Sequence, residues 1–179
     1  MVNEVEVIER TKRWVSDFVV GLNICPFAKY PFDKDLIDYK VYDGIDLEEG
    51  LTVIASELSN LEIERPTESE TTLIILTELA RTFEAYLDLL DQAEEVLVSL
   101  KLEGIIQIAS FHPEYQFAGS AKDDISNHTN RSPYPMIHLL REDSVYEATQ
   151  RHPNVDQIPE QNVQLLESMD ADEVKSYIK

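Results

Sequence analysis

Side chains that can transfer protons or bind anions gather between residues 111 and 141. This stretch reads FHPEYQFAGSAKDDISNHTNRSPYPMIHLLR and contains three of the four histidines, His112, His128 and His138. An imidazole titrates near neutral pH and can act as a general acid or base. Arg131 adds a guanidinium, whose planar fork binds carboxylates and phosphates. The stretch therefore predicts a site for acid–base chemistry on an anionic molecule.

Three residues of this stretch have a chemical and a structural interpretation. His112 precedes a proline, which holds its backbone extended at the end of an expected strand. We expect it to transfer protons, with a hydrogen bond to the loop backbone as the structural alternative. Arg131 is expected to bind the substrate, or else to pair with one of the 35 acidic residues of the chain. Asn130 orients a substrate or, as the more favoured alternative, holds a turn through its own backbone.

The chain has one cysteine, Cys25, in the segment LNICPFAKYP. Its thiolate is a candidate nucleophile if a base such as His112 reaches it, whereas a free cysteine beside apolar residues is more often a small buried hydrophobe. Cys25, His112 and His138 have the right chemistry for zinc, but no paired spacing such as CxxC or HExxH supports it. We therefore expect no metal and no cofactor.

The predicted catalytic residues are thus His112 and Cys25. Arg131 and Asn130 are joined as predicted substrate contacts by three further residues, Ser132, His138 and Tyr115. For His138 the alternative is a hydrogen-bonded core residue, because it shares one face of an expected strand with apolar neighbours.

Hydrophobic spacing predicts the elements that position these residues. Helical spacing of apolar residues covers 4–22, 47–61 and 83–100, with further helices over 144–151 and after Pro159; strands are expected over 37–42, 71–77, 105–111 and 136–140. Alternation of strand and helix predicts that the first three strands run parallel. No helix clearly separates the third strand from the fourth. The fourth is therefore predicted to be antiparallel, which places both ends of the loop on one rim of the sheet.

These elements predict a single α/β domain over 1–179, with a mixed, mostly parallel sheet of about four strands and helices packed on it. Its expected parts are an N-terminal helix (1–24), strand–helix repeats (36–111), a functional loop (112–135), and a last strand with C-terminal helices (136–179). A loop of this length is usually functional or disordered, and its aromatic residues and prolines favour order. Ligands of such sheets sit beyond the carboxyl ends of the strands, where this loop begins.

Composition excludes several classes of partner. The net charge near −20 repels nucleic acid and anionic membranes, and nowhere do 18 apolar residues run together. One cysteine cannot form an internal disulfide, which agrees with a cytoplasmic location. The motifs GxGxxG, GxxxxGK[ST] and GxSxG do not occur. The sequence does not indicate which oligomeric state the protein adopts.

Three segments carry a resemblance to a known family. LNICPFA, FHPEYQFAG and NHTNRSPYPMIHLLRE resemble the shared signature of the bacterial domain-of-unknown-function family DUF1415, over essentially the whole chain. The resemblance implies that Cys25, His112, Asn130, Arg131, Ser132 and His138 occupy motif positions of that family. It implies no established activity.

We therefore expect a cytoplasmic enzyme acting on an anionic small molecule, such as a hydrolase or a transferase, by acid–base or cysteine chemistry. A non-catalytic binding or scaffolding protein is the first alternative, and a metal-binding protein is the second. The enzyme requires a hollow lined by Cys25, His112 and Arg131. The scaffold requires these three residues to be buried and satisfied by each other.

Overall fold

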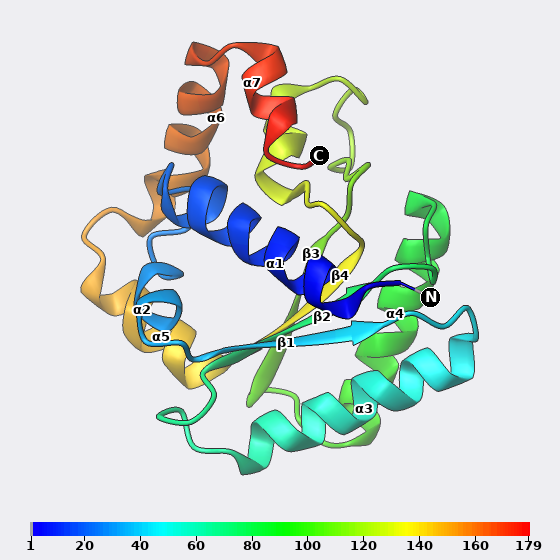
Figure 1. The fold of residues 1–179 in the computed structure, drawn as a ribbon. Helices are drawn as coiled ribbons and strands as arrows, with labels where there is room; N and C mark the ends of the chain where they lie inside the picture. The colour runs from blue at the N-terminus through cyan, green and yellow to red at the C-terminus, as the bar shows by residue number, and fades with distance from the viewer. Residues whose placement is uncertain (1) are drawn as a thin grey trace.

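The computed structural model describes residues 2–179; Met1, the first residue of the predicted segment 1–24, lies outside them. Helices cover both faces of one four-stranded sheet (Figure 1). The strands are β1 (Ile37–Tyr42), β2 (Thr71–Leu76), β3 (Ile106–Phe111) and β4 (Met136–Arg141), and the α-helices are α1 (Glu4–Trp14), α2 (Lys29–Asp33), α3 (Leu47–Ile63), α4 (Phe83–Ser99), α5 (Glu142–Arg151), α6 (Ile158–Ser168) and α7 (Ala171–Ser176). A π-helix, η1 (Val15–Val20), and two 3₁₀ segments, η2 (Ile125–Asn130) and η3 (Val155–Gln157), complete the elements.

The sheet is mixed, in the order β1-β2-β4-β3. The predicted antiparallel fourth strand is confirmed, since β4 runs against both β2 and β3. The predicted mostly parallel character is wrong, because β1 and β2 form the one parallel pair. The reason is the order of the strands. Because β4 runs against both β2 and β3, the first three strands do share one direction, but β4 lies between β2 and β3 and takes the position of the expected parallel neighbour.

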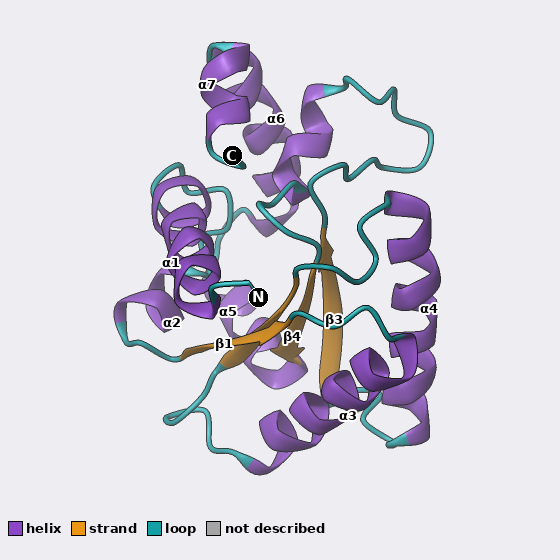
Figure 2. Cartoon of the chain, turned by 45° about the vertical axis from the view of Figure 1, so that its right-hand side comes forward, coloured by secondary structure: helices purple, strands orange, loops and turns teal. Residues whose placement is uncertain are grey.

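Side chains of the central strand alternate between two apolar layers. Leu73 and Ile75 of β2 pack on the side of α1, whereas Ile74 and Leu76 pack on the side of α3 and α4. All six residues of β2 are buried, as expected of a continuous apolar run covered on both faces. In Figure 2, α3 and α4 lie along one side of the strands and α1 along the other, with α6 and α7 beyond the strand ends.

Side chains cap the starts of the two long helices α3 and α4. The Asp46 side chain accepts a hydrogen bond from the Glu49 backbone N–H at 2.9 Å, and the Thr82 hydroxyl accepts one from the Ala85 N–H at 3.3 Å. Each bond satisfies a backbone donor that the first turn of a helix leaves free. The helices α3 and α4 and all four strands lie within about two residues of their predicted bounds.

Three features were not predicted. The first helix continues beyond Trp14 as a π-helix, the segment after Pro26 forms the short helix α2, and the C-terminal helix is divided into α6 and α7. None of the helices within residues 2–179 is both long and apolar enough to cross a bilayer.

Candidate functional site

The loop that joins β3 to β4 is ordered by the amide of Asn127, which is fully buried. Its Oδ1 accepts hydrogen bonds from the Phe117 N–H at 2.9 Å and the Ser120 hydroxyl at 2.8 Å, and its Nδ2 donates to the Ala121 carbonyl at 2.8 Å. One side chain thereby satisfies backbone groups that a long irregular segment would otherwise leave unpaired. Asn127 was not among the predicted site residues, although it lies within the polar stretch.

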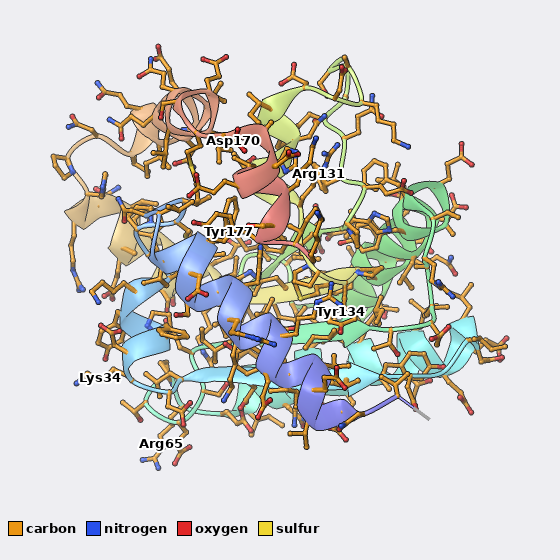
Figure 3. All side chains as sticks on the ribbon, turned by 45° about the horizontal axis from the view of Figure 1, so that its top comes forward. Lys34, Arg65, Arg131, Tyr134, Asp170 and Tyr177 are labelled. Atoms are coloured by element: carbon orange, nitrogen blue, oxygen red, sulfur yellow. The ribbon has the colours of Figure 1, made fainter. Side chains whose placement is uncertain are left out.

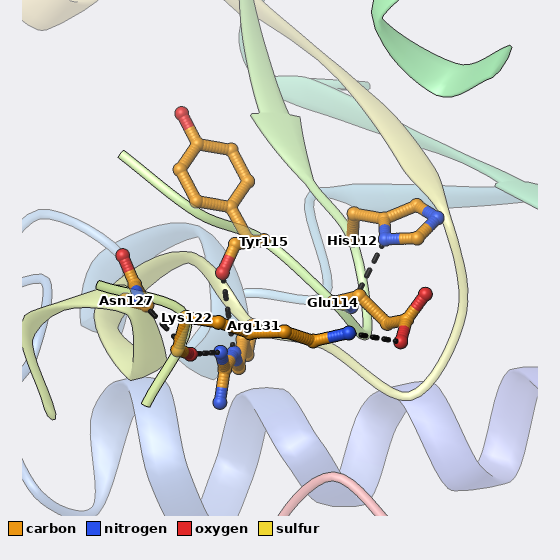
Figure 4. Close-up of polar contacts among 6 residues, drawn as sticks. All are labelled: His112, Glu114, Tyr115, Lys122, Asn127 and Arg131. Atoms are coloured by element: carbon orange, nitrogen blue, oxygen red, sulfur yellow. Dashed lines mark hydrogen bonds and ion pairs between the residues drawn. The ribbon is translucent and has the colours of Figure 1, made fainter. Parts of the chain in front are cut away.

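Arg131 is bound to its own loop (Figure 4). Its Nε donates to the Tyr115 carbonyl at 3.2 Å, one terminal nitrogen donates to the Lys122 carbonyl at 2.6 Å, and the other lies 3.0 Å from His128 Nε2. No carboxylate within residues 2–179 forms an ion pair with it. This part of the loop lies against the C-terminal helices (Figure 3). The guanidinium fork therefore holds three parts of the loop together.

His128 shares that interaction. Because the Arg131 nitrogen can only donate, His128 Nε2 must accept, and its proton resides on Nδ1. Nδ1 is buried and has no hydrogen-bond partner within the described part of the chain. Burial, and then the charge of Arg131, lower the pKa of His128 to about 4. His128 is therefore neutral at pH 7.

His112 is fully buried on the α4 side of the sheet. Its ring packs against Phe83 and Tyr86, with centroids 5.3 and 5.1 Å away. Nδ1 accepts a hydrogen bond from the Glu114 backbone N–H at 2.9 Å, so the proton resides on Nε2, which has no hydrogen bond of ordinary geometry to any of residues 2–179. Burial lowers the pKa of His112. In Figure 4 its imidazole lies apart from the Arg131 guanidinium.

The remaining predicted contacts also bond within the protein. The Asn130 Nδ2 donates to the Ser110 carbonyl at 3.1 Å, and the fully buried Ser132 hydroxyl donates to the Tyr134 carbonyl at 2.6 Å. The Tyr115 hydroxyl lies 3.4 Å from the Ser110 hydroxyl. Each of these bonds fixes a loop residue to β3 or to another part of the loop.

His138 lies within the sheet on β4. The Thr71 hydroxyl donates to the Leu139 carbonyl at 2.6 Å, so it accepts from His138 Nε2, which lies 2.7 Å away. Burial lowers the pKa of His138 to about 4. These contacts are those of the hydrogen-bonded core histidine that the sequence offered as the alternative.

A pocket of about 410 Å³ lies on the α1 side of the strand ends. Three distant segments line it: the end of η1 and its exit turn, the ordered loop with the end of β3, and the start of α6. Its residues are Val19, Ile24, Cys25, Phe111, Phe117, Ser126, Thr129, Asn130, Ile158, Pro159, Asn162 and Val163. The pocket therefore brings together two of the predicted site residues, Cys25 and Asn130.

Cys25 is half-buried in this pocket. Burial raises the pKa of its thiol, and the backbone N–H groups of Phe27 and Ala28 act in the opposite direction. Histidine is absent from the pocket lining, so no general base stands beside the sulfur there. The thiol is therefore protonated at pH 7.

The proposed base for Cys25 lies on the other face of the sheet. Successive residues of an extended strand point to opposite faces. Phe111 packs against Trp14 and lines the pocket together with Cys25, while His112 packs with Phe83. Arg131 does not line the pocket either. The hollow that the enzyme hypothesis requires is thus present, but neither the imidazole of His112 nor the guanidinium of Arg131 lines it.

The residues considered for zinc do not converge. Within residues 2–179, no three histidine, cysteine, aspartate or glutamate side chains come close enough together to hold a metal ion. Cys25, His112 and His138 each have separate surroundings, as described above.

Asn162 of α6 is a pocket residue that the sequence prediction missed. It is 8% exposed, and its Nδ2 donates to the Ile24 carbonyl at 2.8 Å. It stands one helical turn from both Ile158 and the fully buried Leu166, within the apolar stripe of α6. A polar residue at an apolar position of a helix was the signal that could have found it.

Comparison with protein families agrees with the resemblance of the three sequence segments. Comparison with curated proteins and with solved structures finds no match. The profile of the family described as "Protein of unknown function (DUF1415)" matches residues 6–176, nearly the whole chain. The chain therefore belongs to the DUF1415 family.

Proposed function

We propose that this protein binds a small, uncharged and largely apolar molecule in the pocket beside Cys25. The observation that carries the proposal is the lining of that pocket, which contains no lysine, arginine, aspartate, glutamate or histidine. Its volume of about 410 Å³ falls within the range of small-molecule sites, roughly 300–1,000 Å³. Apolar side chains form most of its wall, and hydroxyl, amide and thiol groups supply a few polar contacts.

A neutral ligand suits this pocket better than the anion that the sequence suggested. The anionic metabolite was to be anchored by Arg131, whose guanidinium is bound to the Tyr115 and Lys122 carbonyls. A carboxylate or phosphate placed in a pocket without a cation would lose its hydration and gain no charged partner. We therefore favour binding through apolar contact and hydrogen bonds.

An enzyme that uses Cys25 is the second candidate. It is favoured by one observation, the position of the thiol in the pocket wall. It is opposed by the raised pKa of that thiol and by the location of His112 on the far side of the sheet. Cys25→Ser separates the two candidates, because a binding protein keeps its affinity whereas a cysteine enzyme loses turnover.

A cytoplasmic location belongs to the same proposal. It is supported by the single cysteine, which forms no internal disulfide. The net charge of −20 supports the proposal that nucleic acid is not a partner, because it repels the phosphate backbone.

A screen of neutral and anionic small molecules by thermal shift tests the proposal. Val163→Phe fills the pocket from α6, and Val98→Phe is the matched control at an exposed position of α4. We expect neutral molecules to raise the melting temperature of the parent and of Val98→Phe, and to have no effect on Val163→Phe. Hits that are all anionic, or that stabilise Val163→Phe equally, would overturn the proposal.

A further inference from the structure

We propose that Asn162 selects the ligand of this pocket by accepting a hydrogen bond from it. The ligand class is then neutral molecules that carry a hydroxyl or an N–H group on an apolar body. The inference rests on the proposed function, since it concerns the same pocket, and it names the ligand chemistry that the pocket recognises.

The orientation of the Asn162 amide follows from its fixed partner. The Ile24 carbonyl can only accept, so the group 2.8 Å from it is the amide nitrogen, and Oδ1 points the other way. Oδ1 accepts no hydrogen bond from any residue in 2–179, yet it is not sealed from solvent. Because the residue is more than nine-tenths buried and lines the pocket, the space that Oδ1 reaches is the pocket.

The two hydroxyl groups of the lining and the Nδ2 of Asn130 already have acceptors. The Ser126 hydroxyl donates to Asp124 Oδ1 at 2.7 Å, and the Thr129 hydroxyl donates to the Ser126 carbonyl at 2.8 Å. Asn130 donates through Nδ2 to the Ser110 carbonyl, and its Oδ1 lies 3.1 Å from the Thr129 hydroxyl, whose one proton goes to the Ser126 carbonyl. Asn162 Oδ1 is thus the amide oxygen of the lining that has no hydrogen-bonding group of residues 2–179 in contact with it.

An amide oxygen held in this way discriminates between ligands. A ligand with a donor gives Oδ1 a hydrogen bond in place of the one it would make to solvent. An isosteric ligand without a donor covers the oxygen and leaves it unsatisfied, which costs affinity. We expect the difference to be about tenfold in dissociation constant.

Pairs of neutral probes that differ in one donor provide the test. Indole and benzothiophene, benzyl alcohol and anisole, and cyclohexanol and chlorocyclohexane are titrated into the parent, into Asn162→Leu and into Asn60→Leu. Asn60 is an exposed asparagine of α3 and serves as the matched control. Binding is followed by NMR, with the Asn162 side-chain amide signals of the parent as a second readout that requires no variant to fold.

We expect at least one donor probe to bind the parent about tenfold more tightly than its partner. That preference is expected to persist in Asn60→Leu and to vanish in Asn162→Leu, and the donor probe alone should shift the Asn162 amide signals strongly. Equal binding within every pair would overturn the role of Asn162 and leave the pocket as a binding site. Absence of binding by all six probes would overturn both this inference and the proposed function.

Discussion

Replacing Arg131 tests whether its guanidinium stabilises the loop or binds a ligand. It makes three hydrogen bonds within the protein, to the Tyr115 carbonyl, the Lys122 carbonyl and His128 Nε2. A hydrogen bond to a charged group contributes roughly 1.5–3 kcal/mol, and partial exposure of this side chain lowers that to about 1 kcal/mol each. Arg131→Met should therefore lower the free energy of unfolding by about 3 kcal/mol.

Arg131→Lys should lose about 2 kcal/mol, because a single ammonium cannot reach all three acceptors. Arg151→Met is the control, since Arg151 forms an exposed ion pair with Glu147 on α5, and its replacement should cost less than about 0.5 kcal/mol.

Urea unfolding measures these differences through Trp14. This single tryptophan is buried, and its ring meets Phe111 edge to face at a centroid distance of 5.3 Å. Its fluorescence should therefore report the packing of α1 against the carboxyl end of β3. The reasoning is refuted if Arg131→Met unfolds at the same urea concentration as the parent while ligand binding is lost. Arg131 would then be free to anchor an anion.

Three further outcomes follow from buried polar groups. Burial holds the pKa of both His138 and His128 at about 4, below the ordinary 6.5. Between pH 6.5 and pH 4 the unfolded chain therefore binds more protons than the folded chain, and the free energy of unfolding should fall as the pH drops. For His138 alone the loss at pH 5 is about 2 kcal/mol, and equal urea midpoints at pH 7.5 and pH 5 would contradict it. Thr71→Val removes the partner of His138 and should cost about 1–3 kcal/mol by urea unfolding, whereas Thr71→Ser should retain most of the stability. Asn127→Ala should speed hydrogen exchange of the loop amides by at least about tenfold, and exchange as slow as in the parent would exclude Asn127 as the centre of the loop.

Local pattern predicted the elements well because each depends on neighbouring residues. The apolar run TTLIILT became the central strand β2, and Asp46 and Thr82 begin the helices where their side chains can cap them. The order of the strands in the sheet depends on contacts between segments that are distant in the chain. Nothing in the residues of β3 or β4 indicates that β4 pairs with β2, so the sequence did not predict that β4 would take the place of the parallel neighbour expected for β2.

The candidate site was predicted in part for a similar reason. Cys25 and Asn130 line the pocket, but the position of His112 depends on which face of the sheet the first helix covers. Phe111 and His112 are adjacent in the chain, and the pleat places them on opposite faces. The partners of Arg131 are backbone carbonyls, which every residue possesses, so no residue type marks them in advance.

The most direct test of binding beside Cys25 is the rate at which this thiol is alkylated in the native protein. Because Cys25 is the only cysteine, mass spectrometry assigns every adduct to it. A neutral ligand found by the thermal screen, at about ten times its dissociation constant, should slow alkylation about tenfold, because it leaves only a small fraction of the pocket free. Alkylation at an unchanged rate under the same saturation would show that the ligand binds elsewhere and would contradict the proposed function.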